Sequence, residues 1–126
     1  MTKKIVTRTT EIFLDDSGIL RITVLDGVTI DIDDTVDNLL VIKQLSGGKP
    51  RLKLVDMRVS WKIKKEAREF LLSEDMPERT IARAVLVKSL SNKLMLNFLI
   101  KLNKPQSPLK IFTSEEEAAT WLDSFR

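Results

Sequence analysis

The acidic run from residue 31 to residue 37 carries the residue types best suited to chemistry. Asp31, Asp33 and Thr35 are spaced Asp-x-Asp-x-Thr and follow the short apolar segment 28–30. At the end of a strand, the first carboxylate of such a pattern can attack phosphorus and the second can transfer a proton, while Mg²⁺ bridges to the phosphate. The spacing therefore raises a Mg²⁺-dependent phosphatase as one hypothesis.

Ordinary helix capping explains the same acids. Asp31 is a suitable N-cap for a helix over 32–45, and the carboxylates that follow would lie at the positive end of its dipole. The pattern matches the first motif of haloacid-dehalogenase-like phosphohydrolases, but the strand required before it would be very short, and too little chain follows the N-terminal hairpin for that fold. A calcium loop is excluded because Val36 stands where such a loop needs glycine. We therefore expect no metal site and keep the phosphatase, through Asp31 and Asp33, as a remote alternative.

The composition removes most other catalytic chemistry. The 126 residues include no His, no Cys and no Tyr. Imidazole bases, thiol nucleophiles, Cys/His metal sites and disulfides are therefore excluded. We expect a protein that is not an enzyme and that needs no cofactor.

A second group of polar residues follows the expected buried strands. Asp56 closes the strand over 51–57, and ligands of open α/β sheets gather at the carboxyl ends of strands. With Arg58 and Arg68 nearby in sequence, Asp56 could form a small polar site that includes Ser89, which follows another buried strand. The structural alternative is an Asp–Arg ion pair that holds a corner between strand and helix.

Trp61 stands among basic residues and raises the question of nucleic-acid binding. Together with Lys62, Lys64 and Lys65 it could stack on bases and neutralise phosphates. One aromatic residue is little for a stacking platform, however, and no known nucleic-acid module is visible. We expect Trp61 to anchor the edge of the core and do not expect a nucleic-acid partner.

Hydrophobic periodicity predicts a single α/β domain over residues 1–126. The expected strands are 5–14, 18–25, 51–57, 81–87 and 109–112, and the expected helices are 32–45, 64–73, 89–102 and one that begins near Glu115. The first two strands are joined by a turn and form an antiparallel hairpin. The order ββαβαβαβα implies a mixed sheet of about five strands with about four helices packed on it.

The helix expected after Ser89 has more apolar surface than a sheet normally covers. Its polar residues lie on one narrow stripe, and its apolar residues cover most of the remaining circumference. Met95, Leu99 and Leu102 lie opposite the polar stripe, so we expect them to face the sheet. Two flanks then remain for a neighbour: Leu96 with Ile100, and Leu94 with Phe98. A two-fold partner is a simple solution, and we predict a homodimer that buries one flank.

Several short stretches carry a resemblance to a known family. They are Leu54-Val55-Asp56, Ala67-Arg68-Glu69, Ala84-x-Leu86-Val87-x-Ser89, Asn97-Phe98, Lys104-Pro105-x-x-Pro108, Phe112 and Glu117-Ala118-x-x-Trp121-Leu122. In these stretches the chain resembles the bacterial STAS (SpoIIAA-like) domains, and more closely a family of small STAS/SEC14-like proteins without an established activity. The resemblance implies a SpoIIAA-like fold and a regulatory interaction module, and its SEC14 part implies binding of a lipid or another hydrophobic ligand.

One feature of the STAS class is missing from this chain. In the anti-sigma-factor antagonists, a serine that opens the helix after the third strand is phosphorylated to switch partner binding. The matching position here is Lys64-Lys65-Glu66-Ala67, which contains no serine, and Ser60 lies a few residues too early. We therefore expect an interaction module without that phosphoacceptor.

These observations lead to two functional hypotheses. The first is a bacterial, cytoplasmic, non-enzymatic interaction or regulatory module with no signal peptide and no membrane span, which forms a homodimer and binds an unidentified protein partner. The alternative is a carrier or sensor of a small hydrophobic or anionic ligand. A deep, closed pocket would favour this alternative, and a flat surface of sheet and helices would favour the first hypothesis. The candidate ligand- or partner-binding residues are Asp56, Arg58, Arg68, Ser89, Asn97 and Lys104. The candidate dimer-interface residues are Leu94, Leu96, Phe98 and Ile100.

Overall fold

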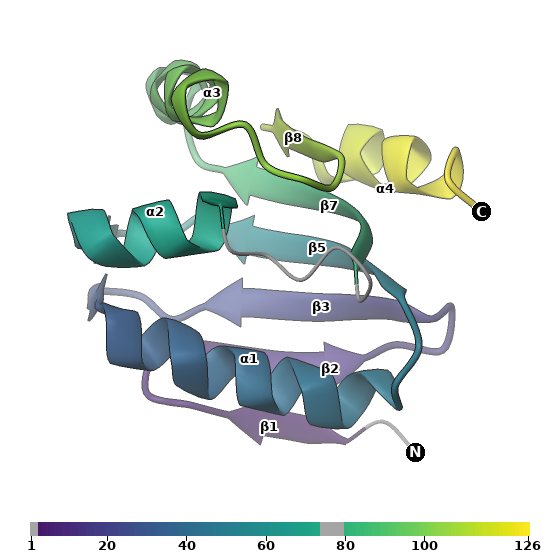
Figure 1. The fold of residues 1–126 in the computed structure, drawn as a ribbon. Coiled ribbons are helices and arrows are strands. Elements are labelled where there is room, and N and C mark those ends of the chain that lie inside the picture. The colour runs from purple at the N-terminus through teal and green to yellow at the C-terminus, as the bar shows by residue number, and fades with distance from the viewer. Residues whose placement is uncertain (1–2, 74–79) are drawn as a thin grey trace.

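A mixed sheet forms the centre of the molecule (Figure 1). The computed structural model describes residues 3–73 and 80–126, and within these the sheet has six strands in the order β1-β2-β3-β5-β7-β8. The first three strands are antiparallel, and β3, β5, β7 and β8 run parallel to one another. The strands are β1 (Lys4–Val6), β2 (Thr10–Leu14), β3 (Ile19–Val24), β5 (Arg51–Met57), β7 (Thr80–Val87) and β8 (Leu109–Phe112).

The expected α/β class with a mixed sheet is confirmed, and the main sheet has six strands among the described residues where about five were expected. The expected first strand, 5–14, is two strands, because the chain turns at Thr7, whose hydroxyl accepts a hydrogen bond from the Thr10 N–H at 3.0 Å. Two short strands, β4 (Val28–Ile30) and β6 (Trp61–Ile63), pair in parallel as a second small sheet. Strands of three residues contain too little alternation to be recognised from sequence.

Among the described residues, three helices cover one face of the main sheet and one helix covers the other (Figure 1). The helices are α1 (Ile32–Ser46), α2 (Lys65–Ser73), α3 (Leu90–Asn103) and α4 (Glu115–Asp123). Local chemistry marks several of their ends: the Ser89 and Ser114 hydroxyls accept backbone N–H groups of the first turns of α3 and α4, and α1 ends at Gly47 in the left-handed conformation, with φ +63°.

Helix α4 packs on its own face of the sheet. Ala82 and Ala84 of β7 are fully buried beneath it, and their small side chains allow the helix to approach closely. Trp121 lies between Phe112 and Phe125, with ring centroids 5.7 and 4.8 Å apart. The buried residues of this layer are Ile19, Leu52, Leu54, Ala82, Ala84, Leu86, Phe112, Ala118 and Leu122.

Helix α3 faces the sheet with a different side from the one predicted. Leu96 and Ile100 pack against Val85, Val87 and Ile111. The expectation that Met95, Leu99 and Leu102 face the sheet was wrong, since Met95 and Leu102 are exposed. It assumed that the polar stripe points into solvent, whereas Lys93 and Asn97 of that stripe are half-buried on the flank of the helix. Leu96 and Ile100 are therefore used within the domain, and only the Leu94–Phe98 flank stays open to a partner.

The described part of the chain contains no helix that is both long and apolar enough to cross a bilayer.

Candidate functional site

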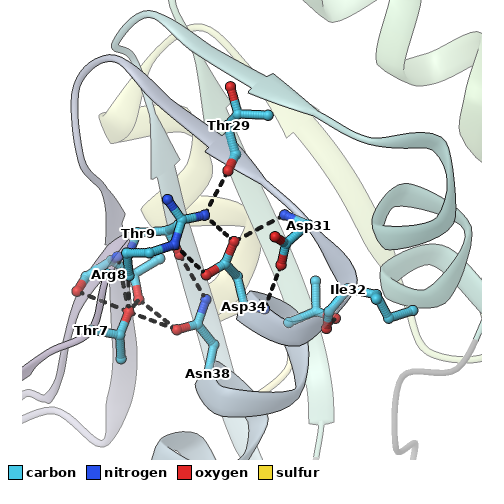
Figure 2. A network of polar contacts seen from close by, with 10 residues as sticks. Thr7, Arg8, Thr9, Thr29, Asp31, Ile32, Asp34 and Asn38 are labelled. Atoms are coloured by element: carbon cyan, nitrogen blue, oxygen red, sulfur yellow. Dashed lines mark hydrogen bonds and ion pairs between the residues drawn. The ribbon is translucent and has the colours of Figure 1, made fainter.

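The acidic run of residues 31–37 builds the start of α1. Asp31 is the N-cap, and its carboxylate accepts the Asp34 N–H at 3.1 Å, while the Asp34 carboxylate accepts the Asp31 N–H at 2.9 Å (Figure 2). Asp34 is buried and forms an ion pair with Arg8, whose Nε donates to it at 2.8 Å. The hydrogen bond from Arg8 holds the pKa of Asp34 below its ordinary value. This reciprocal cap is a structural role for the Asp-x-Asp-x-Thr pattern.

The same network ties α1 to the corner between β1 and β2 (Figure 2). The hydroxyls of Thr7 and Thr10 donate to the Asn38 side-chain oxygen at 2.7 and 3.1 Å, and the Asn38 amide donates to the Thr9 hydroxyl at 3.3 Å. Thr9 and Thr10 are buried. The side chains of Thr7, Thr10 and Asn38 therefore have partners from the protein itself, and the cluster fixes the position of α1.

Asp56 also has a structural partner. Its carboxylate accepts Arg58 at 3.0 and 2.8 Å, and Arg58 donates in turn to Glu115 at 3.0 Å. The hydrogen bond from Arg58 lowers the pKa of Asp56. This ion-pair chain connects the carboxyl end of β5 to the first turn of α4, as the structural alternative predicted.

The structure does not gather the predicted site residues into one place. Asp56 and Arg58 lie toward α4, whereas Arg68 lines a cavity on the opposite face of the sheet. Ser89 caps α3 and borders a surface groove together with Ser60, Trp61, Lys88, Asn92 and others. Lys104 ends α3 in the left-handed conformation, at φ +46°, and Asn97 is half-buried on the same helix. The polar site around Asp56 that the sequence suggested, with Arg68 and Ser89 as members, is therefore not formed.

A cavity of about 150 Å³ lies between the sheet and the three helices α1, α2 and α3. Helix α2 packs mainly against α1 and α3, and its Ala67 lies in one buried cluster with Val24 and Ile30 of the strands. The apolar residues that line it from the sheets include Ile22, Val24, Ile30, Val55, Met57, Val85 and Ile111, and those from the helices include Leu39, Ile42, Phe70, Leu71, Leu96 and Ile100.

Three basic side chains interrupt this apolar lining: Lys53, Arg68 and Arg83. Lys53, only 3% exposed, donates to the Thr80 hydroxyl at 2.6 Å, and Arg83 donates to the Leu71 carbonyl at 3.1 Å. Among the described lining residues there is no Asp or Glu. The cavity therefore combines apolar walls with positive charge.

Trp61 separates this cavity from the surface groove beside Ser89, because its side chain lines both. Its indole N–H donates to the Met57 carbonyl at 3.1 Å, which fixes the ring against the end of β5. Trp61 packs against the cluster that contains Val24 and Ile30. Its predicted role as an anchor at the edge of the core is confirmed.

Sequence reasoning found Arg68 but missed the cavity and its two other basic residues. The sequence does contain a signal for these two residues. Lys53 stands between Leu52 and Leu54 in a central strand, and Arg83 stands between two alanines in the neighbouring strand. These positions are register partners across β5 and β7. A charged residue at an inward position of a buried strand needs a compensating environment, and two such residues side by side point to a built polar site.

The fold belongs to a known structural class. An uncharacterised protein from Shewanella loihica PV-4, of the DUF3478 family and with a SpoIIAA-like fold, superposes with a TM-score of 0.61 at 12% identity, covering 97% of this chain and 92% of that one. The protein is thus an α/β domain of SpoIIAA-like fold, as the sequence resemblance implied.

The sequence also defines a family. Residues 12–126 match the family described as "Domain of unknown function (DUF7793)", and the chain belongs to it. A protein of unknown function from Arthrobacter sp. FB24 is 26% identical, with 94% of this chain and 95% of that one covered, at a TM-score of 0.31 that carries no argument about the fold. No curated protein matches this chain.

Proposed function

We propose that this domain is a non-enzymatic binding module that holds a small ligand with an apolar body in the cavity beneath α2. The observation that carries the proposal is the cavity itself, about 150 Å³ of space with largely apolar walls between the sheet and three helices. Protein interiors are packed so closely that voids of this size are few. The proposal corresponds to the carrier or sensor hypothesis of the sequence analysis.

The size of the cavity limits the ligand. An engineered apolar cavity of about 150 Å³ takes up benzene, whereas pockets for drug-sized ligands measure about 300–1,000 Å³. The ligand is therefore about as large as one aromatic ring or a short branched chain. A complete phospholipid, which the SEC14 part of the resemblance would suggest, does not fit.

The lining supports binding rather than catalysis. Among the described lining residues, the hydroxyl and amide groups of Thr10, Thr35 and Asn38 accompany three basic side chains and no carboxylate. Thr10 and Asn38 already bond to each other, and the Thr35 hydroxyl donates to the Ile32 carbonyl at 2.6 Å. A general base or an activated nucleophile therefore has no clear candidate among these groups.

A titration followed by NMR tests the proposal. We expect benzyl alcohol to shift the methyl resonances of lining residues such as Leu71, Val85 and Ile111. Val55→Phe would fill part of the cavity and weaken binding, while Val6→Phe, the same change at an exposed position of β1, would leave it unchanged. The absence of saturable shifts, or shifts confined to the outer face of α3, would contradict the proposal.

We propose in addition that a second copy of the chain covers the outer face of α3. Five large apolar side chains on this face are between 47 and 64% exposed: Leu90, Leu94, Met95, Phe98 and Leu102. Together they form an apolar patch on the order of 500 Å², near the largest that monomers usually expose. That is below the roughly 800 Å² per partner of a standard interface, so the flanking surface would also have to contribute. The apolar row runs along the helix, so two antiparallel copies of α3 would pack their apolar rows against each other.

The dimer is tested by sedimentation velocity at high micromolar concentration. Phe98→Glu should give a folded monomer, because it places a charge in the centre of the patch. Leu40→Glu is the matched control, since Leu40 on α1 is 63% exposed and Phe98 is 61% exposed. A monomeric wild type, or a dimer that survives Phe98→Glu, would contradict the second copy and leave the face to a different protein.

A further inference from the structure

Arg68 is a basic residue of the cavity whose side-chain Nε has no hydrogen-bond partner among the described residues. It lies on α2, is half-buried and lines the cavity, and its Nε atom is fully buried without a hydrogen-bond acceptor. Its backbone is ordinary for a helix, with the N–H donating to the Lys64 carbonyl at 3.0 Å. Only the guanidinium is therefore left with unused hydrogen-bonding capacity.

A buried guanidinium nitrogen without an acceptor is unfavourable. Folded proteins pair almost all buried polar atoms, and a missing partner of this kind indicates a bound water, ion or ligand. Guanidinium groups present a rigid fork of donors that matches a carboxylate, and such charge-assisted bonds are stronger than neutral ones. The group that would satisfy Arg68 best is therefore an anionic oxygen acceptor.

The neighbouring charges favour the same ligand. Lys53 and Arg83 line the same cavity, and no Asp or Glu of the described residues faces it with them. Both have partners within the protein, but their charges still raise the local potential, and electrostatic interactions are stronger in a weakly polarisable interior than in water. An anion is thereby favoured over a neutral molecule of the same shape.

We infer that the ligand of this cavity is a small apolar acid and that Arg68 binds its carboxylate. This inference rests on the proposed function, and it adds the chemical class of the ligand and the residue that selects it. The apolar walls hold the ring or branched chain, and the guanidinium holds the anionic end. A ligand of this class has one ionised group on a body of about the size of benzene.

Calorimetric titration with two isosteric probes tests the inference on the full chain. Benzoate and benzamide have nearly the same shape and differ in charge. We expect the wild type to bind benzoate at least tenfold more tightly than benzamide. Arg68→Met should reduce this preference to less than threefold, and Arg68→Lys should retain part of it. Lys65→Met is the matched control, because it removes a positive charge from the same helix at a side chain that is 77% exposed.

Each outcome separates the inference from the proposed function. Equal affinities of the wild type for the two probes would overturn the inference, with a bound water as the remaining partner of Arg68, but would leave the cavity as a binding site. A preference that is unchanged in Arg68→Met would overturn the assignment to Arg68. Failure of both probes to bind the wild type would contradict the proposed function and the inference together. If Arg68→Met does not fold, the comparison of benzoate with benzamide in the wild type and in Arg68→Lys still tests the inference.

Discussion

Replacing Asp34 by Asn would test whether the acidic run has the structural role that the network indicates. The carboxylate accepts hydrogen bonds from Arg8 and from the Asp31 N–H. An asparagine has only one side-chain oxygen, so it can accept only some of these hydrogen bonds. Its amide group would also bring a hydrogen-bond donor toward Arg8, which is itself a donor. The variant is therefore expected to lose charge-assisted hydrogen bonds at the start of α1 without losing the helix.

The size of the expected loss of stability follows from how far the side chains of Asp34 and Arg8 are exposed to solvent. Hydrogen bonds to charged groups contribute about 1.5–3 kcal/mol, and the side chain of Asp34 is 7% exposed. That of Arg8 is 59% exposed, so solvent screens the pair. We expect Asp34→Asn to lower the free energy of unfolding by about 1–2 kcal/mol near neutral pH.

The difference in the free energy of unfolding between the wild type and Asp34→Asn should depend on pH in a defined direction. The hydrogen bond from Arg8 lowers the pKa of Asp34 in the folded state. A group whose pKa is lower when folded stabilises the protein above its unfolded pKa, and this stabilisation is lost as the pH falls through the folded pKa. The wild type should therefore lose its advantage over Asp34→Asn on acidification below about pH 4.

Urea denaturation followed by tryptophan fluorescence, at about pH 7 and about pH 2.5, measures both quantities. Asp33→Asn is the control, because Asp33 is the exposed neighbour of Asp34, and it should change the free energy of unfolding by less than about 0.5 kcal/mol. An equal deficit for Asp34→Asn at both pH values would show that the contribution is not electrostatic and would refute the reasoning.

Further predictions concern α3, the acidic motif and the absent switch. At a concentration low enough for the chain to be monomeric, Leu96→Ala should lower the free energy of unfolding by about 2 kcal/mol and Phe98→Ala by less than about 0.5 kcal/mol, as measured by urea denaturation, because only Leu96 packs on the sheet. Equal costs would contradict this orientation of α3. Asp31→Asn combined with Asp33→Asn should be nearly neutral, since asparagine also caps helices, and Mg²⁺-dependent phosphomonoester hydrolysis that the double variant abolishes would reverse this view. Mass spectrometry of protein from cells should find no stoichiometric phosphate on Ser60; its presence would place the switch there.

Much of the fold could be predicted from local patterns. Alternation in β3, the consecutive apolar residues of β7 and the capping acids of α1 each have a short-range physical cause, so sequence alone was sufficient. The orientation of α3 was not predictable in this way, because its apolar residues cover most of the circumference and tertiary packing selects the inward side. Leu96 and Ile100 were placed on a flank for that reason.

The candidate site was predictable only in part. Asp56 and Arg58 are two residues apart, and their ion pair follows from that proximity. Arg68 was assigned to the same site because it is near in sequence, but β5 and α2 place it on the other face of the sheet. The cavity lies between one face of the sheet and three helices, so it depends on how these elements pack together, which is not encoded in any short segment.

The central claim, that the cavity holds a small apolar ligand, is tested most directly by extraction and mass spectrometry. Protein purified from its own host would be denatured, and the released small molecules would be quantified against the same preparation of Val55→Phe. We predict close to one equivalent of a small organic acid with roughly ten non-hydrogen atoms, strongly depleted in the variant. Equal recovery from both proteins, or recovery of a phospholipid in its place, would contradict the claim.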